Sequence, residues 1–322
     1  STGLLSLHSA VNPLVNAGVV HGAGVIISGA GLNNSGGQIG GGPLILDVAQ
    51  NVNNQQGHID VNSDSFIRVG GDLLNTGGRI DAGSLDLQVV GSVRSGADGA
   101  NQRATGIVTH AGDLSFVVGG DFTMQGGDLK SSGQMKGFVR GDIKIDGVSG
   151  VSSSTQQQRS WKNIADERSG NAYGNFSGSF GQSLVDQFTY ETNASERTTA
   201  GVREASAVQA GAGMLLIAGG NASYEGTNLS AGGDLLLGAV RGDLRIAAQD
   251  HTESNTTQRN QYGVLGTGVQ TSTYTHEYSE QWTGGALNSG GQITLLPGRD
   301  LVLEGSQATA AGRIDGLAGR DA

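Results

Sequence analysis

Two Arg-Gly-Asp tripeptides are the most specific binding motifs in this sequence. They stand at Arg140-Gly141-Asp142 and Arg241-Gly242-Asp243. Integrin-type adhesion receptors bind this tripeptide when it lies in an exposed loop. The same residues also suit a plain chain corner, because Gly and Asp both favour turns. A related segment reads Gly319-Arg320-Asp321, with Arg displaced, which favours the corner over the adhesion motif.

Asp60 and Asp81 are the best candidates for metal binding or acid–base chemistry. They occur in the related triplets His58-Ile59-Asp60 and Arg79-Ile80-Asp81. If the triplets stack in neighbouring strands, the carboxylates lie about 4.8 Å apart. Such a pair could bind Ca²⁺ or serve polysaccharide cleavage. The preceding equivalent position is Gly40 and Arg79 can offset the charge, so a solvated acidic face is the favoured interpretation.

The remaining residue types give little support for catalysis. The six histidines are scattered without the spacing of a metal site, the chain has no cysteine, and the tandem nonapeptides of calcium-binding β-helices are absent. We therefore expect no metal, no cofactor and no enzymatic activity.

The candidate residues belong to an internal repeat. The segments Asp121–Asp142, Asn221–Asp243 and Asp300–Asp321 align, and their end residues are 21, 22 and 21 positions apart. Each contains short apolar runs separated by Gly-Gly or Gly-Asp turns. Gly interrupts nearly every helix-sized window, and the framework of leucine-rich repeats is missing. A period of about 20 to 22 residues therefore predicts an all-β parallel β-helix, each repeat forming one turn of the coil, or rung.

Composition supports this fold class and excludes others. The chain has 322 residues, of which 57 are Gly and only 3 are Pro. Average Gly usage is about 7%, and no Gly-X-Y period indicates collagen. The net charge of −10 argues against nucleic acid as a partner. No run of about 18 apolar residues predicts a membrane-spanning helix. Because the chain starts within the repeat pattern, we expect it to be part of a longer protein.

Two kinds of rung divide the chain into residues 1–118 and 119–322. The first region has a shorter variant, Leu32-Asn-Asn-Ser-Gly-Gly-Gln-Ile39, which recurs at Val52–Ile59 and, one residue shorter, at Leu74–Ile80. The same motif returns at Leu287–Ile293. We expect the second region to continue the stack of the first.

Two long excursions interrupt the second region, at 147–212 and 249–285. Both begin with polar Ser, Thr and Gln residues, and together they hold ten of the aromatic residues, from a total of 2 Trp, 6 Tyr and 7 Phe. Disordered loops are usually poor in aromatic residues, so we expect β-hairpin-like strands. Alternation places Tyr274, Tyr278 and Trp282 on one strand face. With Phe188 and Tyr190, they form the candidate interaction face, which either packs against the coil or contacts a partner.

The rungs resemble the repeats of filamentous haemagglutinin, which occur in the large exoproteins of bacterial two-partner secretion. These exoproteins include adhesins and contact-dependent growth inhibition proteins. The resemblance rests on the recurring Gly-Gly-Asp-Leu and Asn-Xaa-Gly-Gly-Xaa-Ile rungs and on the Ser/Thr-rich excursions. It implies a right-handed β-helix, secreted by an outer-membrane partner to the surface of a Gram-negative cell. In the contact-dependent inhibition proteins, the second repeat type is associated with the target cell's outer membrane and with toxin delivery.

The sequence therefore predicts a structural filament segment that mediates cell–cell contact. The alternative is a polysaccharide-binding or polysaccharide-cleaving β-helix. A groove lined by polar residues from three adjacent rungs would favour the alternative.

Overall fold

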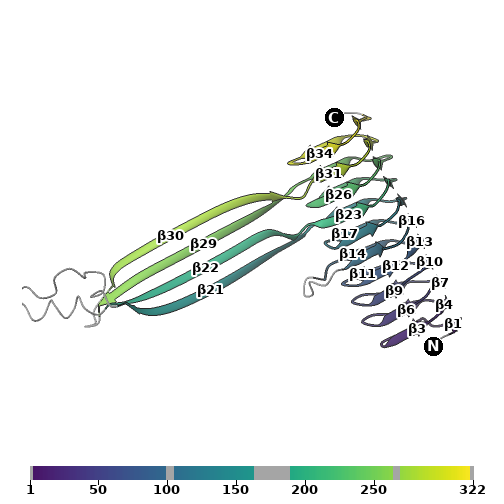
Figure 1. Ribbon diagram of the computed structural model, residues 1–322, viewed down its shortest axis with the longest axis horizontal. Coiled ribbons are helices and arrows are strands. Elements are labelled where there is room, and N and C mark those ends of the chain that lie inside the picture. Colours follow the sequence, from purple (N-terminus) through teal and green to yellow (C-terminus); the bar gives the residue numbers. More distant parts are fainter. Residues whose placement is uncertain (1–2, 99–104, 163–188, 264–268, 320–322) are drawn as a thin grey trace, which may run out of the picture. The chain divides into compact units, whose positions relative to one another are not determined.

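The structure is a computed structural model that describes residues 3–98, 105–162, 189–263 and 269–319 (Figure 1). Every regular element among these residues is a β-strand. The chain divides into two compact units, which we describe separately. The coil unit contains residues 1–149, 202–250 and 282–322, and the sheet unit contains residues 150–201 and 251–281.

The coil unit consists of three parallel sheets of 11, 10 and 10 strands, here named A, B and C. Sheet A contains β1 (Leu4–Ser9), β4 (Gly24–Gly29), β7 (Leu44–Val48), β10 (Asp64–Val69), β13 (Ser84–Val89), β16 (Leu114–Val118), β19 (Met135–Val139), β24 (Met214–Ala218), β27 (Leu235–Ala239), β32 (Ile293–Pro297) and β35 (Ile314–Gly316). Sheet B contains β2 (Leu14–Val15), β5 (Leu32–Asn33), β8 (Val52–Asn53), β11 (Leu73–Thr76), β14 (Val93–Gly96), β17 (Phe122–Gln125), β20 (Ile143–Asp146), β25 (Ala222–Glu225), β28 (Leu244–Ala247) and β33 (Leu301–Glu304). Sheet C contains β3 (Val19–Gly22), β6 (Gln38–Gly41), β9 (His58–Val61), β12 (Arg79–Ala82), β15 (Gly106–Thr109), β18 (Asp128–Ser131), β23 (Ser206–Ala210), β26 (Thr227–Ala231), β31 (Ala286–Ser289) and β34 (Gln307–Ala310).

The chain visits sheets A, B and C in turn, and each strand pairs in parallel with the strand of the next rung. For example, Leu216 pairs with Leu237, and Leu237 pairs with Leu295. All three sheets pass from the first repeat region into the second without a break in strand order. The predicted parallel β-helix is therefore confirmed.

The core is built from inward side chains at alternate positions of each strand. Leu235, Leu237, Leu244 and Ile246 are each 0% exposed, as the alternation predicted. Arg245 points outward and forms ion pairs with glutamates of the two neighbouring rungs. Because equivalent positions stack, each inward leucine contacts the same position one rung above and below, and the core becomes a set of apolar ladders.

A ladder of buried asparagines holds the corner between sheets B and C in the first region. Asn34, Asn54 and Asn75 are 0% exposed. The Nδ2 group of Asn34 donates to Oδ1 of Asn54 at 2.7 Å, and Asn54 donates to Asn75 at 2.7 Å. The ladder continues from Asn16 into Asn34 and from Asn75 into Ser95. Buried amides need such partners, which explains the Asn in the repeated motif.

The two glycine positions of this motif favour glycine for different reasons. The first lies in the left-handed region, with φ of 67° at Gly36 and 68° at Gly77. The second approaches the rung below so closely that a Cβ at Gly57 would lie 2.2 Å from the carbonyl oxygen of Asn34. Only a residue without a side chain fits there.

The structure corrects two details of the motif. Leu73, rather than Leu74, pairs with Val52, so the third copy is not shorter than the others. The copy at Leu287–Ile293 lies at a different corner, because it joins β31 of sheet C to β32 of sheet A. Similar residues recur there because any tight corner of a stacked coil favours Gly.

The excursions contain the four strands of a fourth sheet, here named D, with the order β21-β22-β29-β30. These strands are β21 (Val148–Lys162), β22 (Thr189–Glu204), β29 (Gln249–Gly263) and β30 (Val269–Thr283). The coil resumes at Ser206, so the predicted bounds of the first excursion, 147–212, extend too far. The sequence alone does not indicate strand β23, because Val208 is its only large apolar residue.

The two faces of β27 test the assigned core. Leu237→Ala removes a fully buried side chain and should cost about 2–5 kcal/mol of unfolding free energy. The matched variant Leu236→Ala, on the outward face of the same strand, should cost about 1 kcal/mol or less. Urea denaturation measures both values. Equal losses for the two variants would show that the inward register is wrong.

Candidate functional site

Both Arg-Gly-Asp tripeptides lie at the corner between sheets A and B. Arg140-Gly141-Asp142 joins β19 to β20, and Arg241-Gly242-Asp243 joins β27 to β28. The two arginines are exposed at the surface of the corner. The surroundings of the Gly and Asp residues decide what each tripeptide can present to a partner.

Each Asp of the tripeptides belongs to a hydrogen-bond ladder that joins successive corners. The backbone N–H of Asp142 donates to Oδ1 of Asp121 at 2.9 Å, and Oδ1 of Asp142 accepts from the N–H of Asn221 at 2.7 Å. One rung further, Oδ1 of Asn221 accepts from the N–H of Asp243 at 3.0 Å. The same pattern leads from Asn51 through Asp72 and Ser92 to Asp121, and from Asp243 to Asp300. We call this set the A–B corner ladder.

The ladder also determines the glycine before each Asp. A Cβ on Gly141 would lie 2.0 Å from Oδ1 of Asp121, and one on Gly242 would lie 2.4 Å from Oδ1 of Asn221. The side-chain oxygen of the preceding rung thus occupies the space that a larger residue needs. Stacking at this corner therefore requires Gly before Asp142 and before Asp243, and of each tripeptide only the arginine is unconstrained by the ladder.

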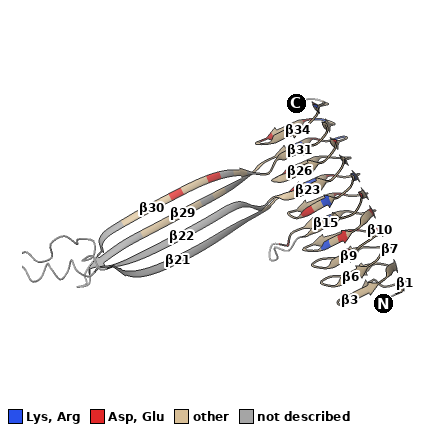
Figure 2. Cartoon of the chain, in the orientation of Figure 1, with Lys and Arg blue, Asp and Glu red and all other residues tan. Residues whose placement is uncertain are grey.

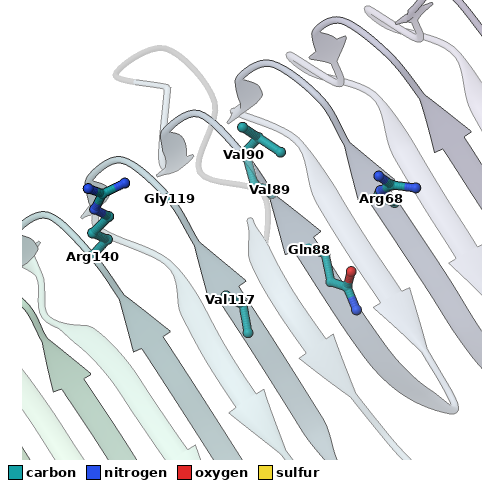
Figure 3. A pocket seen from close by; sticks show the side chains of 7 residues that line it. All are labelled: Arg68, Gln88, Val89, Val90, Val117, Gly119 and Arg140. Atoms are coloured by element: carbon teal, nitrogen blue, oxygen red, sulfur yellow. The ribbon is translucent and has the colours of Figure 1, made fainter.

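Arg140 also lines a surface hollow of about 570 Å³ on the outer side of sheet A (Figure 3). Arg68, Gln88, Val90 and Val117 line it as well. Val90 and Val117 are 65% and 50% exposed, so the floor is apolar and open to solvent. Sequence reasoning missed this hollow because its residues come from separate rungs and meet only through the strand register.

The aromatic residues of β30 are exposed. Tyr274, Tyr278 and Trp282 have 67%, 61% and 61% of their surface accessible, and alternation along β30 places them on one face with His276 and Glu280. The imidazole Nδ1 of His276 lies 3.1 Å from Oγ1 of Thr256 on β29. Tyr274 and Tyr278 belong to the sheet unit, whereas Trp282 belongs to the coil unit and lies beside Gly305.

The two other residues of the candidate interaction face are described only in part or not at all. Tyr190 lies on β22, where its backbone pairs with that of Tyr262 on β29. Phe188 lies outside the described residues. One shared interaction face therefore stays a prediction.

Asp60 and Asp81, the acidic candidates of sheet C, are not arranged as a catalytic pair. Asp60 and Asp81 are Cα partners in neighbouring rungs, but Asp81 is bound by Arg79 at 2.8 Å and by His110 at 3.0 Å. No group of three His, Cys, Asp or Glu residues suited to a metal ion occurs in the described part of the chain.

A small polar hollow of about 250 Å³ lies on the outer side of three adjacent rungs of sheet C. It is lined by Val19, His21, Gln38, Ile39, Gly40, Gly41, His58, Asp60 and Asn62. Such a hollow is the feature expected for the polysaccharide alternative. However, Asp60 is its only carboxylate, and glycoside hydrolysis generally requires two. The lining therefore gives no support to a cleavage reaction.

Two ionisable groups near the excursions have shifted pKa values. Burial raises the pKa of Asp146, against the opposing effect of Lys144, at the point where β20 ends and the first excursion begins. Burial also raises the pKa of the Tyr224 hydroxyl, which lies in the core without a hydrogen-bond partner among the described residues. Neither group is part of a cluster that could perform acid–base catalysis.

Comparison with known protein families matches one part of the chain. Residues 254–322 match the hemagglutinin repeat. This match begins within β29 and includes β30 and the rungs that follow. It supports a filamentous haemagglutinin-like repeat, which is a structural repeat of secreted surface adhesins and indicates an extracellular or cell-surface location. Neither curated proteins nor solved structures gave a match.

No helix that is long and apolar enough to cross a membrane occurs among the residues that the structure describes.

Variants of the first tripeptide separate its structural role from adhesion. Gly141→Ala places a Cβ against Asp121 and should cost about 1–3 kcal/mol of unfolding free energy through overpacking. Arg140→Ala should change it by about 0.5 kcal/mol at most, because Arg140 is exposed and outside the ladder. Thermal and urea denaturation measure both. If Gly141→Ala is as stable as the parent chain, the A–B corner ladder does not hold the corner.

Proposed function

We propose that this chain is a segment of a bacterial surface filament and that its excursions carry a surface for contact with another cell. The coil supplies length and rigidity through stacked rungs. The excursions supply a surface that the rungs do not encode. The filament part of this proposal is supported by the filamentous adhesin-like repeat at residues 254–322.

The observation that carries this proposal is the common position of the insertions. Both excursions leave the coil after a strand of sheet B and return to a strand of sheet C, after β20 and after β28. The shorter insertion between β14 and β15 interrupts the same corner of an earlier rung. Random insertions would be distributed over all three corners. Because all three insertions lie between sheets B and C, we infer that this corner is the variable one and that the other two corners stay regular.

The chemistry of β30 supports a contact role for the second excursion. Tyr274 and Tyr278 are exposed on a face that also carries the polar residues His276 and Glu280. Tyrosine suits such a surface because its ring is apolar and its hydroxyl remains hydrated. Exposed aromatic residues of this kind often mark interaction sites.

We further propose that the full-length protein leaves a Gram-negative cell through an outer-membrane secretion partner. The target is then the surface or outer membrane of a neighbouring cell, and toxin delivery is a further role of proteins with such repeats. The resemblance of the rungs to two-partner secretion exoproteins supports this more specific proposal.

The experiment is a binding assay of the purified chain on intact Gram-negative cells. Tyr274→Ser/Tyr278→Ser should reduce binding at least about tenfold, equivalent to about 1.4 kcal/mol, while the melting temperature stays unchanged. The control Thr275→Ala/Ser279→Ala alters the opposite face of β30 and should bind like the parent chain. Unchanged binding of the tyrosine variant, or equal loss for both variants, would contradict the proposal.

A further inference from the structure

Sheet D ends in two long edge strands. Among the strands that the structure describes, β21 and β30 each have a neighbour on one side only. Each is 15 residues long. An edge of this length presents unpaired N–H and C=O groups that can pair with another strand. Natural edges are usually protected by Pro or Lys, and β30 contains neither.

The centre of sheet D shows how one excursion pairs with another. Strand β22 ends the first excursion, β29 begins the second, and they pair antiparallel over thirteen residue pairs from Thr189↔Gly263 to Gly201↔His251. The sequences of β22 and β29 are rich in Ser, Thr, Asn and Gln, and the backbone pairing holds the two strands together. We call this pairing the excursion join.

The edge strands share short sequence motifs with the two strands of the excursion join. In β22, four residues separate a Thr-Tyr pair from a Ser-Glu pair, at 189–190 and 195–196, and β30 has the same pattern at 273–274 and 279–280. Strand β29 contains Gln258-Arg259, and β21 contains Gln158-Arg159. Thus β30 is equivalent to β22, and β21 is equivalent to β29.

We propose that β30 of one chain pairs antiparallel with β21 of a second copy, repeating the excursion join between molecules. Ala194 lies opposite Gln258 in the join, so the equivalent intermolecular pair is Tyr278 with Gln158 of the second copy. The contact uses two different edges, so it is head-to-tail and can continue through further copies. Sheet D would thereby connect neighbouring copies of the chain.

Charge complementarity identifies the second copy as the occupant of this edge. Strand β30 carries Glu277 and Glu280 and neither Lys nor Arg, and its acidic positions are red in Figure 2. Strand β21 carries Arg159 and Lys162 and no acidic residue. The Asn193↔Arg259 pair of the join becomes Glu277 opposite Arg159 of the second copy. Opposite charges directly across an antiparallel pair favour that register.

Disulfide trapping tests the proposal, because the chain has no cysteine of its own. Chains with Tyr278→Cys and chains with Gln158→Cys are mixed and oxidised mildly with diamide. We expect a mixed disulfide dimer at least tenfold more abundant than with the control Thr275→Cys, which lies on the other face of β30. Ala194→Cys/Gln258→Cys within one chain is the reference for folding and for the known register.

A charge exchange distinguishes the proposed contact from non-specific aggregation. Glu277→Lys should lower the yield of the mixed dimer, and Arg159→Glu on the other chain should restore it. Cross-linking that is equal at positions 275 and 278, or unaffected by either charge change, would overturn the proposal. The proposal is also overturned if the chains stay monomeric by sedimentation velocity while the reference disulfide forms. The outcome does not depend on whether the chain binds cells.

Discussion

The constraint on which the whole coil depends is the close approach of one rung to the next at each corner. Parallel strands set the rung spacing at about 4.8 Å, so the corners must stack at the same distance. At the A–B corner, side-chain oxygens accept from backbone N–H groups of the next rung, in steps from Asp121 to Asp243. At the B–C corner, each Asn amide donates to the Asn of the next rung, from Asn34 to Asn75. These ladders satisfy buried or crowded polar groups and leave room only for glycine at positions such as Gly57 and Gly141.

This constraint separates the parts of the chain that must repeat from those that can vary. Inward positions must stay apolar and the ladder residues must keep their acceptors, so neither can evolve a binding function freely. The outward side chains and the insertions are free to change. The insertions are concentrated between sheets B and C, whereas the A–B corner stays uninterrupted in the described rungs. We infer that specificity in such a filament lies in the insertions, with a contribution from outward residues such as Arg140.

Much of the fold could be predicted from the sequence, because the repeat pattern recurs many times and each recurrence indicates the same rung length. The alternation of Leu235 and Leu237 was sufficient to assign the core face. The corner of the Leu287 motif could not be assigned, since similar Gly-rich residues suit any corner. The hollow beside Arg140 and the excursion join required the register between rungs or strands, which no single segment contains. Tyr274 and Tyr278 are exposed, but their role and their partner stay predictions.

The most direct test of the corner constraint compares two adjacent asparagines. Asn54→Asp removes the buried donor of the B–C ladder and introduces a buried charge, which should cost about 3 kcal/mol or more. Asn53→Asp keeps the oxygen that accepts from the N–H of Gln55 and should be nearly neutral. Native-state hydrogen exchange of the amides in β5, β8 and β11 measures the difference. Our account predicts a local loss of protection for Asn54→Asp alone, and equal protection in the two variants would contradict it.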